Sequence, residues 1–262
     1  MLAIKVYNAP QGRGPNPWKV NILLEELGVP YETVWIPYGE IKQEPYTLLN
    51  PNGRVPAMVD PNKNVTLWES GAIVNYLIAT YDKDLRFTYG DDRFEEKWQL
   101  QSWLMFQMSG QGPMFGQKVW FTYMHVEENL TTAIDRYGNE AKRILGMMDG
   151  FLGKRRKSLG LGPDAPVWLV GDKYTYADLS FIPWNTFLPT MFPNGDLNLE
   201  QDYPEFFRWH MNMISRPATK KVLEYREECI RTLTDTGSAV VARQKDARGL
   251  PNYGPTVGIS KS

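Results

Sequence analysis

The sequence is poor in cysteine: Cys229 is the only one among 262 residues. A single cysteine excludes an internal disulfide framework, a Cys-x-x-Cys redox pair and a metal cluster built from thiolates. Any thiol chemistry that the chain performs is therefore expected to use a thiol that arrives with a ligand. We expect no metal cofactor.

Long apolar runs and excess charge are also missing. No apolar run approaches the ~18 residues that a membrane span needs. The segment after Met1, "LAIKVY", has the pattern of a strand and not that of a secretory signal. The formal net charge is −1, and no long basic stripe is present, which argues against nucleic acid as a partner. We expect a cytoplasmic protein that binds neither membranes nor nucleic acid.

The N-terminal third predicts an α/β domain. "LAIKVY" and "YETVWIPY" have the composition of strands, and "NPWKVNILLEELG" between them predicts a helix. Asn16 suits the N-cap of that helix, Pro17 its first position and Gly28 the residue just past its end. A strand, a helix and a second strand form a crossover unit, in which the connection is right-handed and the strands are parallel.

The next segments complete that domain. "IKQEPYTLLN" predicts a short, irregular helical segment. "VPAMVD" and "VTLW" are two short apolar runs around a Pro-Asn-Lys-Asn turn, which predicts a hairpin. "SGAIVNYLIATY" predicts a helix. The order is therefore βαβ, then α, then ββα.

After a polar crossing segment the pattern is helical almost throughout. "TYAD" has the spacing of a capping box, with Asp178 in place of the usual Glu three residues after Thr175. From Thr236 onward Gly, Pro, Ser and charged residues are frequent. We predict an α/β domain over 1–84, an all-helical domain over 91–235 and a disordered or surface-lying tail over 236–262.

One stretch, "RVPAMVDPNKNVTLWESGAIVNYL", carries the clearest functional signal. Pro56 cannot donate a hydrogen bond to a strand ladder, so it belongs at an edge or a bend. We predict a cis Val55–Pro56 bond, which would turn the N–H and C=O of Val55 outward. An extended peptide could then pair with Val55 as an added strand.

Glu69 and Ser70 lie where a strand runs into a helix. Backbone N–H groups at a helix start favour anions. Ser70 can cap the helix and donate its hydroxyl to a carboxylate, while Glu69 can accept an ammonium group. An isolated pair is more simply a plain N-cap. Next to Val55, however, the pair predicts a site for a short peptide with a free α-amino acid end, the shape of glutathione at its γ-glutamyl end.

With "RVPAMVD", "WESGAIVNYL" and "DKYTYADLSFIPW" in this order, the sequence resembles the cytosolic glutathione transferases from Ala3 to about Leu233. The resemblance implies a thioredoxin-like domain followed by an all-helical domain, and a homodimer. It implies glutathione or glutathione disulfide as ligand, with a small electrophile or disulfide as the second substrate.

Three further segments are similar to one branch of that family: "GPNPWKVNILLEELGVPYET", "GQGPMFGQ" and "AIDRYGNEAKRILGMMD". The branch comprises the fungal nitrogen-regulator-like transferases and the bacterial nu-class disulfide-bond reductases. By this resemblance, Asn16 contacts the glutathione sulfur and Arg136 reaches the site from the helical domain. The bacterial relatives carry a Thr two residues before that Asn. Gly14 stands there in this sequence, so one hydroxyl donor is missing.

The resemblance also assigns supporting residues. It places Arg54 near the glycyl carboxylate or a second glutathione, and Lys42 or Gln43 near the glycyl end. Tyr7 is a rival activator of the sulfur by analogy with other transferase classes, although an aromatic residue that ends a strand is usually core. The predicted function is glutathione-dependent reduction of disulfides or peroxides, or removal of glutathione adducts, with weak conjugation of electrophiles. The alternative is a glutathione-binding regulator or carrier with little turnover.

Overall fold

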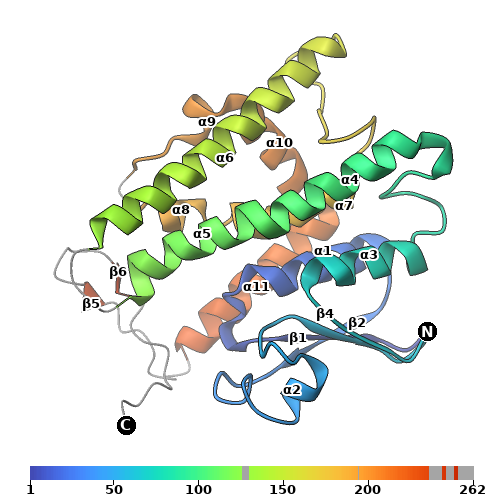
Figure 1. Ribbon diagram of the computed structural model, residues 1–262, viewed down its shortest axis with the longest axis vertical. Helices are drawn as coiled ribbons and strands as arrows, with labels where there is room; N and C mark the ends of the chain where they lie inside the picture. Colours follow the sequence, from blue (N-terminus) through green and yellow to red (C-terminus); the bar gives the residue numbers. More distant parts are fainter. Residues whose placement is uncertain (126–129, 194, 236–243, 246–250, 253–262) are drawn as a thin grey trace. The chain divides into compact units, whose positions relative to one another are not determined.

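The computed structural model describes the chain except residues 126–129, 194, 236–243, 246–250 and 253–262 (Figure 1). Contacts divide it into two compact units. The first comprises Met1–Trp98 together with the segment from Ser215 that forms α11, and the second comprises Gln99–Ile214. The domain boundaries at 84, 91 and 235 stay a prediction. The tail predicted over 236–262 lies largely outside the described residues.

The first unit is built on a four-stranded sheet in the order β2-β1-β3-β4. Strand β1 pairs in parallel with β2 and antiparallel with β3, and β3 pairs antiparallel with β4. The parallel pair and the hairpin are therefore confirmed. The strands are β1 (Ile4–Asn8), β2 (Tyr31–Trp35), β3 (Ala57–Asp60) and β4 (Val65–Trp68).

Helices cover this sheet. Figure 1 shows α1 and α3 along one side of the strands and α2 on the other. Helix α1 packs against both α3 and α11, so the last long helix of the chain belongs to the first unit. The helical elements are η1 (Pro10–Gly12), α1 (Pro15–Leu27), α2 (Tyr46–Leu49), α3 (Ser70–Tyr81), η2 (Asp91–Arg93) and α11 (Pro217–Asp235).

The start of α1 differs from the prediction. Gly14 is the N-cap and Pro15 the first helical residue, so Asn16 is not the cap but the second residue of the helix. Both Pro15 and Pro17 lack a backbone N–H, and both are tolerated in a first turn where that donor has no partner. The sequence pattern alone could not show which of the two prolines begins the helix. Gly28 ends the helix at a left-handed φ of 69°, as predicted.

The second unit is helical. Helix α4 begins in the first unit and continues into the second. Two π-helical segments, η3 and η4, flank α5, and such segments are frequent at functional sites. The elements are α4 (Phe94–Phe106), η3 (Gln107–Gln111), α5 (Gly112–Val119), η4 (Trp120–Met124), α6 (Thr131–Ser158), α7 (Tyr176–Asn185), α8 (Leu188–Met191), α9 (Leu199–Asp202) and α10 (Pro204–Ile214). A short pair, β5 (Gln244–Lys245) and β6 (Pro251–Asn252), follows.

The predicted capping box is present at the start of α7. The buried carboxylate of Asp178 accepts hydrogen bonds from the N–H and the hydroxyl of Thr175, at 2.9 and 3.0 Å. It also accepts from the N–H of Leu169 and from Nε1 of Trp209. Burial raises the pKa of Asp178, whereas these hydrogen bonds favour its charged form. The carboxylate thus joins α7, α10 and the preceding loop. Among the described helices, none is both long and apolar enough to cross a membrane.

Candidate functional site

Side chains from α2 and its C-cap hold the backbone just before β3 by hydrogen bonds. The Val55–Pro56 bond is cis, as predicted. The carbonyl oxygen of Arg54 accepts a hydrogen bond from the hydroxyl of Tyr46 at 2.7 Å and from Nδ2 of Asn50 at 2.6 Å. Tyr46 and Asn50 are both buried, whereas the Arg54 side chain is exposed. Two buried donors thus hold the residue that leads into Val55.

Lys42 lies against the same turn. Its Nζ donates to the carbonyl oxygen of Asn52 at 2.9 Å. A Cβ on Gly53, whose φ is +57°, would lie 2.8 Å from Cδ of Lys42, so the lysine stem crosses closely over that glycine. Lys42 therefore packs against the turn that leads to Arg54, and both side chains carry positive charge. Gln43 is exposed beside them.

The start of α3 corrects one sequence interpretation. Glu69 is the N-cap and makes no side-chain cap hydrogen bond, and Ser70 is already the first helical residue. The predicted N-cap role of Ser70 is therefore wrong, because the chain leaves the strand at Glu69 with φ 66° and ψ 115°. A non-glycine residue at such a φ costs about 1–3 kcal/mol and is typical of functional positions. Glu69 is exposed, and Ser70 is only 2% exposed.

Asn16 is half-buried in the first turn of α1. The N-cap before it, Gly14, has no side chain that could cap the helix or donate to a ligand. The turn before the helix is tight, because Gly12 has a φ of +58° and its carbonyl oxygen accepts a hydrogen bond from Nε1 of Trp18 at 2.6 Å. The position of Asn16 is thus set by a backbone turn that α1 itself closes.

Sequence reasoning missed Lys19, one helical turn after Asn16. Its side chain is buried, with 2% exposed. Burial lowers the pKa of the Lys19 ammonium to about 7, while the negative charge of Glu69 opposes that shift. Lysine is almost never fully buried without a partner. A lone basic residue between Trp18 and Val20, in a helix apolar on most sides, was the signal that could have identified it.

Tyr7 packs against other aromatic and apolar residues. Its ring centroid lies 5.9 Å from that of Tyr46, and it borders a cluster that includes Ala57. These contacts match the core interpretation.

Arg136 lies on α6 in the second unit, whereas the other predicted site residues lie in the first. Its side chain is exposed, and its charge adds to the hydrogen bond from Arg143 that holds the pKa of Glu140 below the ordinary value. The structure therefore places Arg54, Val55 and Pro56 on one segment, with Lys42 packed against the turn before it, and Arg136 belongs to the other unit.

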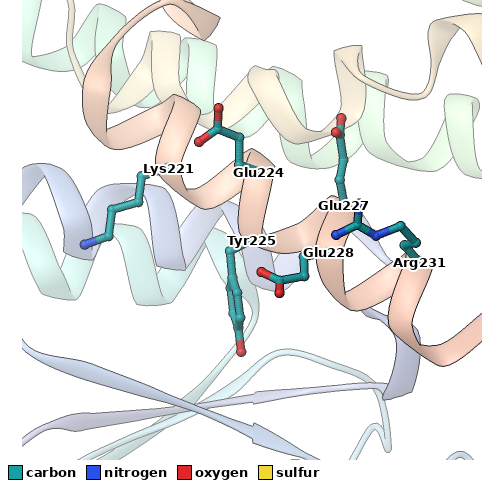
Figure 2. A pocket seen from close by; sticks show the side chains of 6 residues that line it. All are labelled: Lys221, Glu224, Tyr225, Glu227, Glu228 and Arg231. Atoms are coloured by element: carbon teal, nitrogen blue, oxygen red, sulfur yellow. The ribbon is translucent and has the colours of Figure 1, made fainter. Parts of the chain in front are cut away.

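Cavities border helix α11. The one in Figure 2, of about 670 Å³, is lined by six α11 side chains: Lys221, Glu224, Tyr225, Glu227, Glu228 and Arg231. Figure 2 shows Tyr225 pointing from α11 toward the strands. A second cavity, of about 410 Å³, includes Pro10, Trp35 and Cys229, and burial raises the pKa of that thiol. Within the described residues, no group of three His, Cys, Asp or Glu could hold a metal ion.

Both units of the chain match known protein families. Residues 14–80 match the model of the glutathione S-transferase N-terminal domain, and residues 112–217 match that of the C-terminal domain. The chain is 43% identical to the glutathione S-transferase-like protein gedE of Aspergillus terreus, over 85% of this chain and 95% of that protein.

Solved structures agree with the sequence matches. Glutathione transferase URE2P5 from Phanerochaete chrysosporium superposes with a TM-score of 0.79 at 36% identity, covering 88% of this chain and 98% of the other. URE2P6 from the same organism, solved in complex with oxidised glutathione, has a TM-score of 0.76 at 40% identity, covering 86% and 97%.

Proposed function

Because the chain belongs to the glutathione transferase family, among Ure2-like fungal members, we propose that it is an enzyme that uses glutathione to reduce small disulfides or peroxides, or to remove glutathione adducts. Weak conjugation of electrophiles is a side activity of the same thiolate. A cytoplasmic location would supply the reduced glutathione that this chemistry consumes. The observation that carries the proposal is the complex of the similar URE2P6 with oxidised glutathione, two glutathione units joined by a disulfide.

For a disulfide substrate the proposed reaction has two steps. The thiolate of one glutathione attacks a substrate sulfur, which forms a mixed disulfide and releases the other half of the substrate as a thiolate that takes up a proton. The thiolate of a second glutathione then attacks the glutathione sulfur of the mixed disulfide. The products are glutathione disulfide and two thiols, so two glutathiones are oxidised for each disulfide reduced.

The residues proposed to bind the first glutathione all lie in the first unit. Val55 offers its backbone to the cysteinyl part of glutathione, Glu69 accepts the α-ammonium and Ser70 donates to the α-carboxylate. Lys42 and Arg54 supply positive charge for the glycyl carboxylate. The strained backbone of Glu69 and the two buried donors that hold Arg54 support this assignment, since both fix groups that a ligand would contact.

Asn16 is proposed to stabilise the reacting sulfur. An ordinary thiol has a pKa of about 8.5 and is mostly protonated at neutral pH. A hydrogen bond to a charged group is worth about 1.5–3 kcal/mol, and one pKa unit corresponds to about 1.4 kcal/mol. A donor at Asn16 is therefore expected to lower the pKa of the glutathione thiol to about 7, and the positive end of α1 adds to this effect.

Arg136 is proposed to hold a second glutathione or the disulfide substrate.

We also propose that the protein is a homodimer. The dimer is supported by Phe94 and Trp98, whose side chains are 63% and 56% exposed and whose ring centroids are 6.1 Å apart. Two large exposed aromatic side chains side by side are typical of a surface that another protein covers.

The test of the proposed function is turnover of hydroxyethyl disulfide with reduced glutathione, measured beside glutathione affinity by calorimetry. Turnover together with binding supports the enzyme. The second candidate is a glutathione-binding regulator or ligand carrier with little turnover, and it is favoured by Gly14, which supplies no hydroxyl near the sulfur. Binding without turnover would support that candidate.

A further inference from the structure

Helix α11 reaches the turn that leads into the proposed sulfur site. The family model of the C-terminal domain ends at residue 217, so α11 (Pro217–Asp235) extends beyond it. Helix α11 nevertheless packs in the first unit, against α1 and η1. It therefore brings residues from the far end of the chain to the backbone just before Asn16.

One buried side chain makes that contact. Arg226 is only 8% exposed, and its Nε donates to the carbonyl oxygen of Gly12 at 3.3 Å. Its second terminal nitrogen donates to the carbonyl oxygen of Arg13 at 3.5 Å. Burial lowers the pKa of the Arg226 guanidinium to about 10, which leaves the group cationic at neutral pH. A planar guanidinium can bond two neighbouring carbonyls at once, which an ammonium group does less well.

The turn that Arg226 contacts is held by side chains from both α11 and α1. The Gly12 carbonyl accepts from both Arg226 and Trp18, so it is bonded from α11 and from α1. A Cβ at Gly12 would lie 2.5 Å from Cζ2 of Trp18. Trp18 in turn packs edge-on against Tyr225 of α11, with ring centroids 6.0 Å apart.

We propose that Arg226 is a positioning residue for the thiol chemistry: from α11 it fixes the Gly12–Arg13 backbone and thereby the first turn of α1, where Asn16 lies. The inference rests on the proposed role of Asn16 as donor to the sulfur. A hydrogen bond weakens steeply when its geometry is lost. A looser turn therefore costs the thiolate its donor while the Val55, Glu69 and Ser70 contacts remain.

The test measures the pKa of the thiol of bound glutathione, from the ultraviolet absorption of the thiolate as a function of pH, in the full-length protein. Arg226→Met is expected to raise the midpoint by at least half of the rise that Asn16→Ala causes. Glutathione affinity should change by less than about threefold, since the residues that bind the rest of the ligand are intact.

Lys221→Met is the matched control. Lys221 also joins α11 to α1, through Nζ and Oε1 of Glu25 at 2.5 Å, but at the other end of α1. This variant loses a docking contact without touching the turn, so its thiol midpoint should equal that of the wild type. Equal shifts in Lys221→Met and Arg226→Met would show that α11 acts only through general stability, and would overturn the proposal.

A double variant separates the two proposals. If Arg226 acts through Asn16, adding Arg226→Met to Asn16→Ala should move the midpoint no further. A midpoint that Asn16→Ala shifts but Arg226→Met does not would overturn the positioning role alone. A midpoint that Asn16→Ala leaves unchanged would overturn the sulfur assignment itself. If Arg226→Met does not fold, Arg226→Lys carries the test: it should give a smaller shift in the same direction, and an unchanged midpoint would overturn the role.

Discussion

The hydroxyl of Tyr46 on α2 donates a hydrogen bond of 2.7 Å to the carbonyl oxygen of Arg54, the residue immediately before Val55. This contact ties a buried aromatic residue to the backbone that is proposed to bind glutathione. Because Asn50 donates to the same oxygen at 2.6 Å, the carbonyl keeps one partner if the hydroxyl is removed.

Tyr46→Phe tests this support. Removing one of two donors costs about 0.5–1.5 kcal/mol, so we expect glutathione to bind up to about tenfold more weakly. Adding Asn50→Ala should weaken binding further, since the Arg54 carbonyl then loses both donors. Calorimetric titration of the single and double variants measures the effect. Unchanged glutathione affinity in the double variant would show that this turn does not contribute to glutathione binding.

Ser70→Ala should affect binding much more than folding. A hydroxyl that donates to a charged carboxylate is worth about 1.5–3 kcal/mol, or about 10- to 100-fold in affinity. Because Glu69 and not Ser70 is the N-cap of α3, the substitution leaves the N-cap residue in place. Thr66→Ala, at an exposed position of β4, is the control for loss of a hydroxyl. Calorimetry that finds the same glutathione affinity in Ser70→Ala and wild type would remove Ser70 from the site.

Lys19 is expected to make the stability of the protein depend on pH. Burial lowers its pKa from 10.5 to about 7, so between these values the unfolded chain binds more protons than the folded one. The contribution of Lys19 is therefore least favourable below about pH 7 and improves as the pH rises toward 10. Lys19→Met should stabilise the protein at about pH 6 by more than about 1 kcal/mol, and this gain should shrink at about pH 9.

Urea unfolding of Lys19→Met at both pH values measures this change, with exposed Lys63→Met as the control. Glu69 is exposed, so water can solvate its carboxylate when Lys19 is gone. A gain that is the same at both pH values would mean that Lys19 does not lose its proton in this range.

Arg136→Ala should raise KM for the disulfide substrate and leave glutathione affinity nearly unchanged. Removing a positive charge that faces a carboxylate or sulfur partner is expected to raise KM for a disulfide substrate, by about tenfold if one charged hydrogen bond is lost. Glutathione affinity should stay within about threefold, because Val55, Glu69 and Ser70 lie in the other unit. Steady-state kinetics with varied disulfide tests this, and a variant that loses glutathione affinity with unchanged KM would contradict it.

The sequence predicted most of the first unit because local signals and periodicity agreed there. The crossover strands, the hairpin and the helix after Glu69 were all expected, as was the capping box at Thr175. The predicted N-caps of α1 and α3 were wrong, each for a local reason. At α1 two prolines in the first turn were equally acceptable. At α3 a strained Glu69 replaced the more common Ser cap.

What depended on contacts between distant residues could not be predicted. The pairing of Arg226 with Gly12 joins positions 214 residues apart, and no periodicity marks it. The burial of Lys19 depends on how α1 packs against the other elements of the first unit, which sequence spacing does not specify. The π-helical segments around α5 also had no signal, because their composition is that of ordinary helix.

The central claim is that Asn16 stabilises the reacting sulfur. The measurement that tests it most directly is the pH titration of the thiol of bound glutathione in the wild type and in Asn16→Ala, with Tyr7→Phe alongside. We predict a midpoint near pH 7 in the wild type and in Tyr7→Phe, and a return toward about 8.5 in Asn16→Ala, with a matching fall in kcat at neutral pH. A midpoint and rate in Asn16→Ala equal to those of the wild type would contradict the claim.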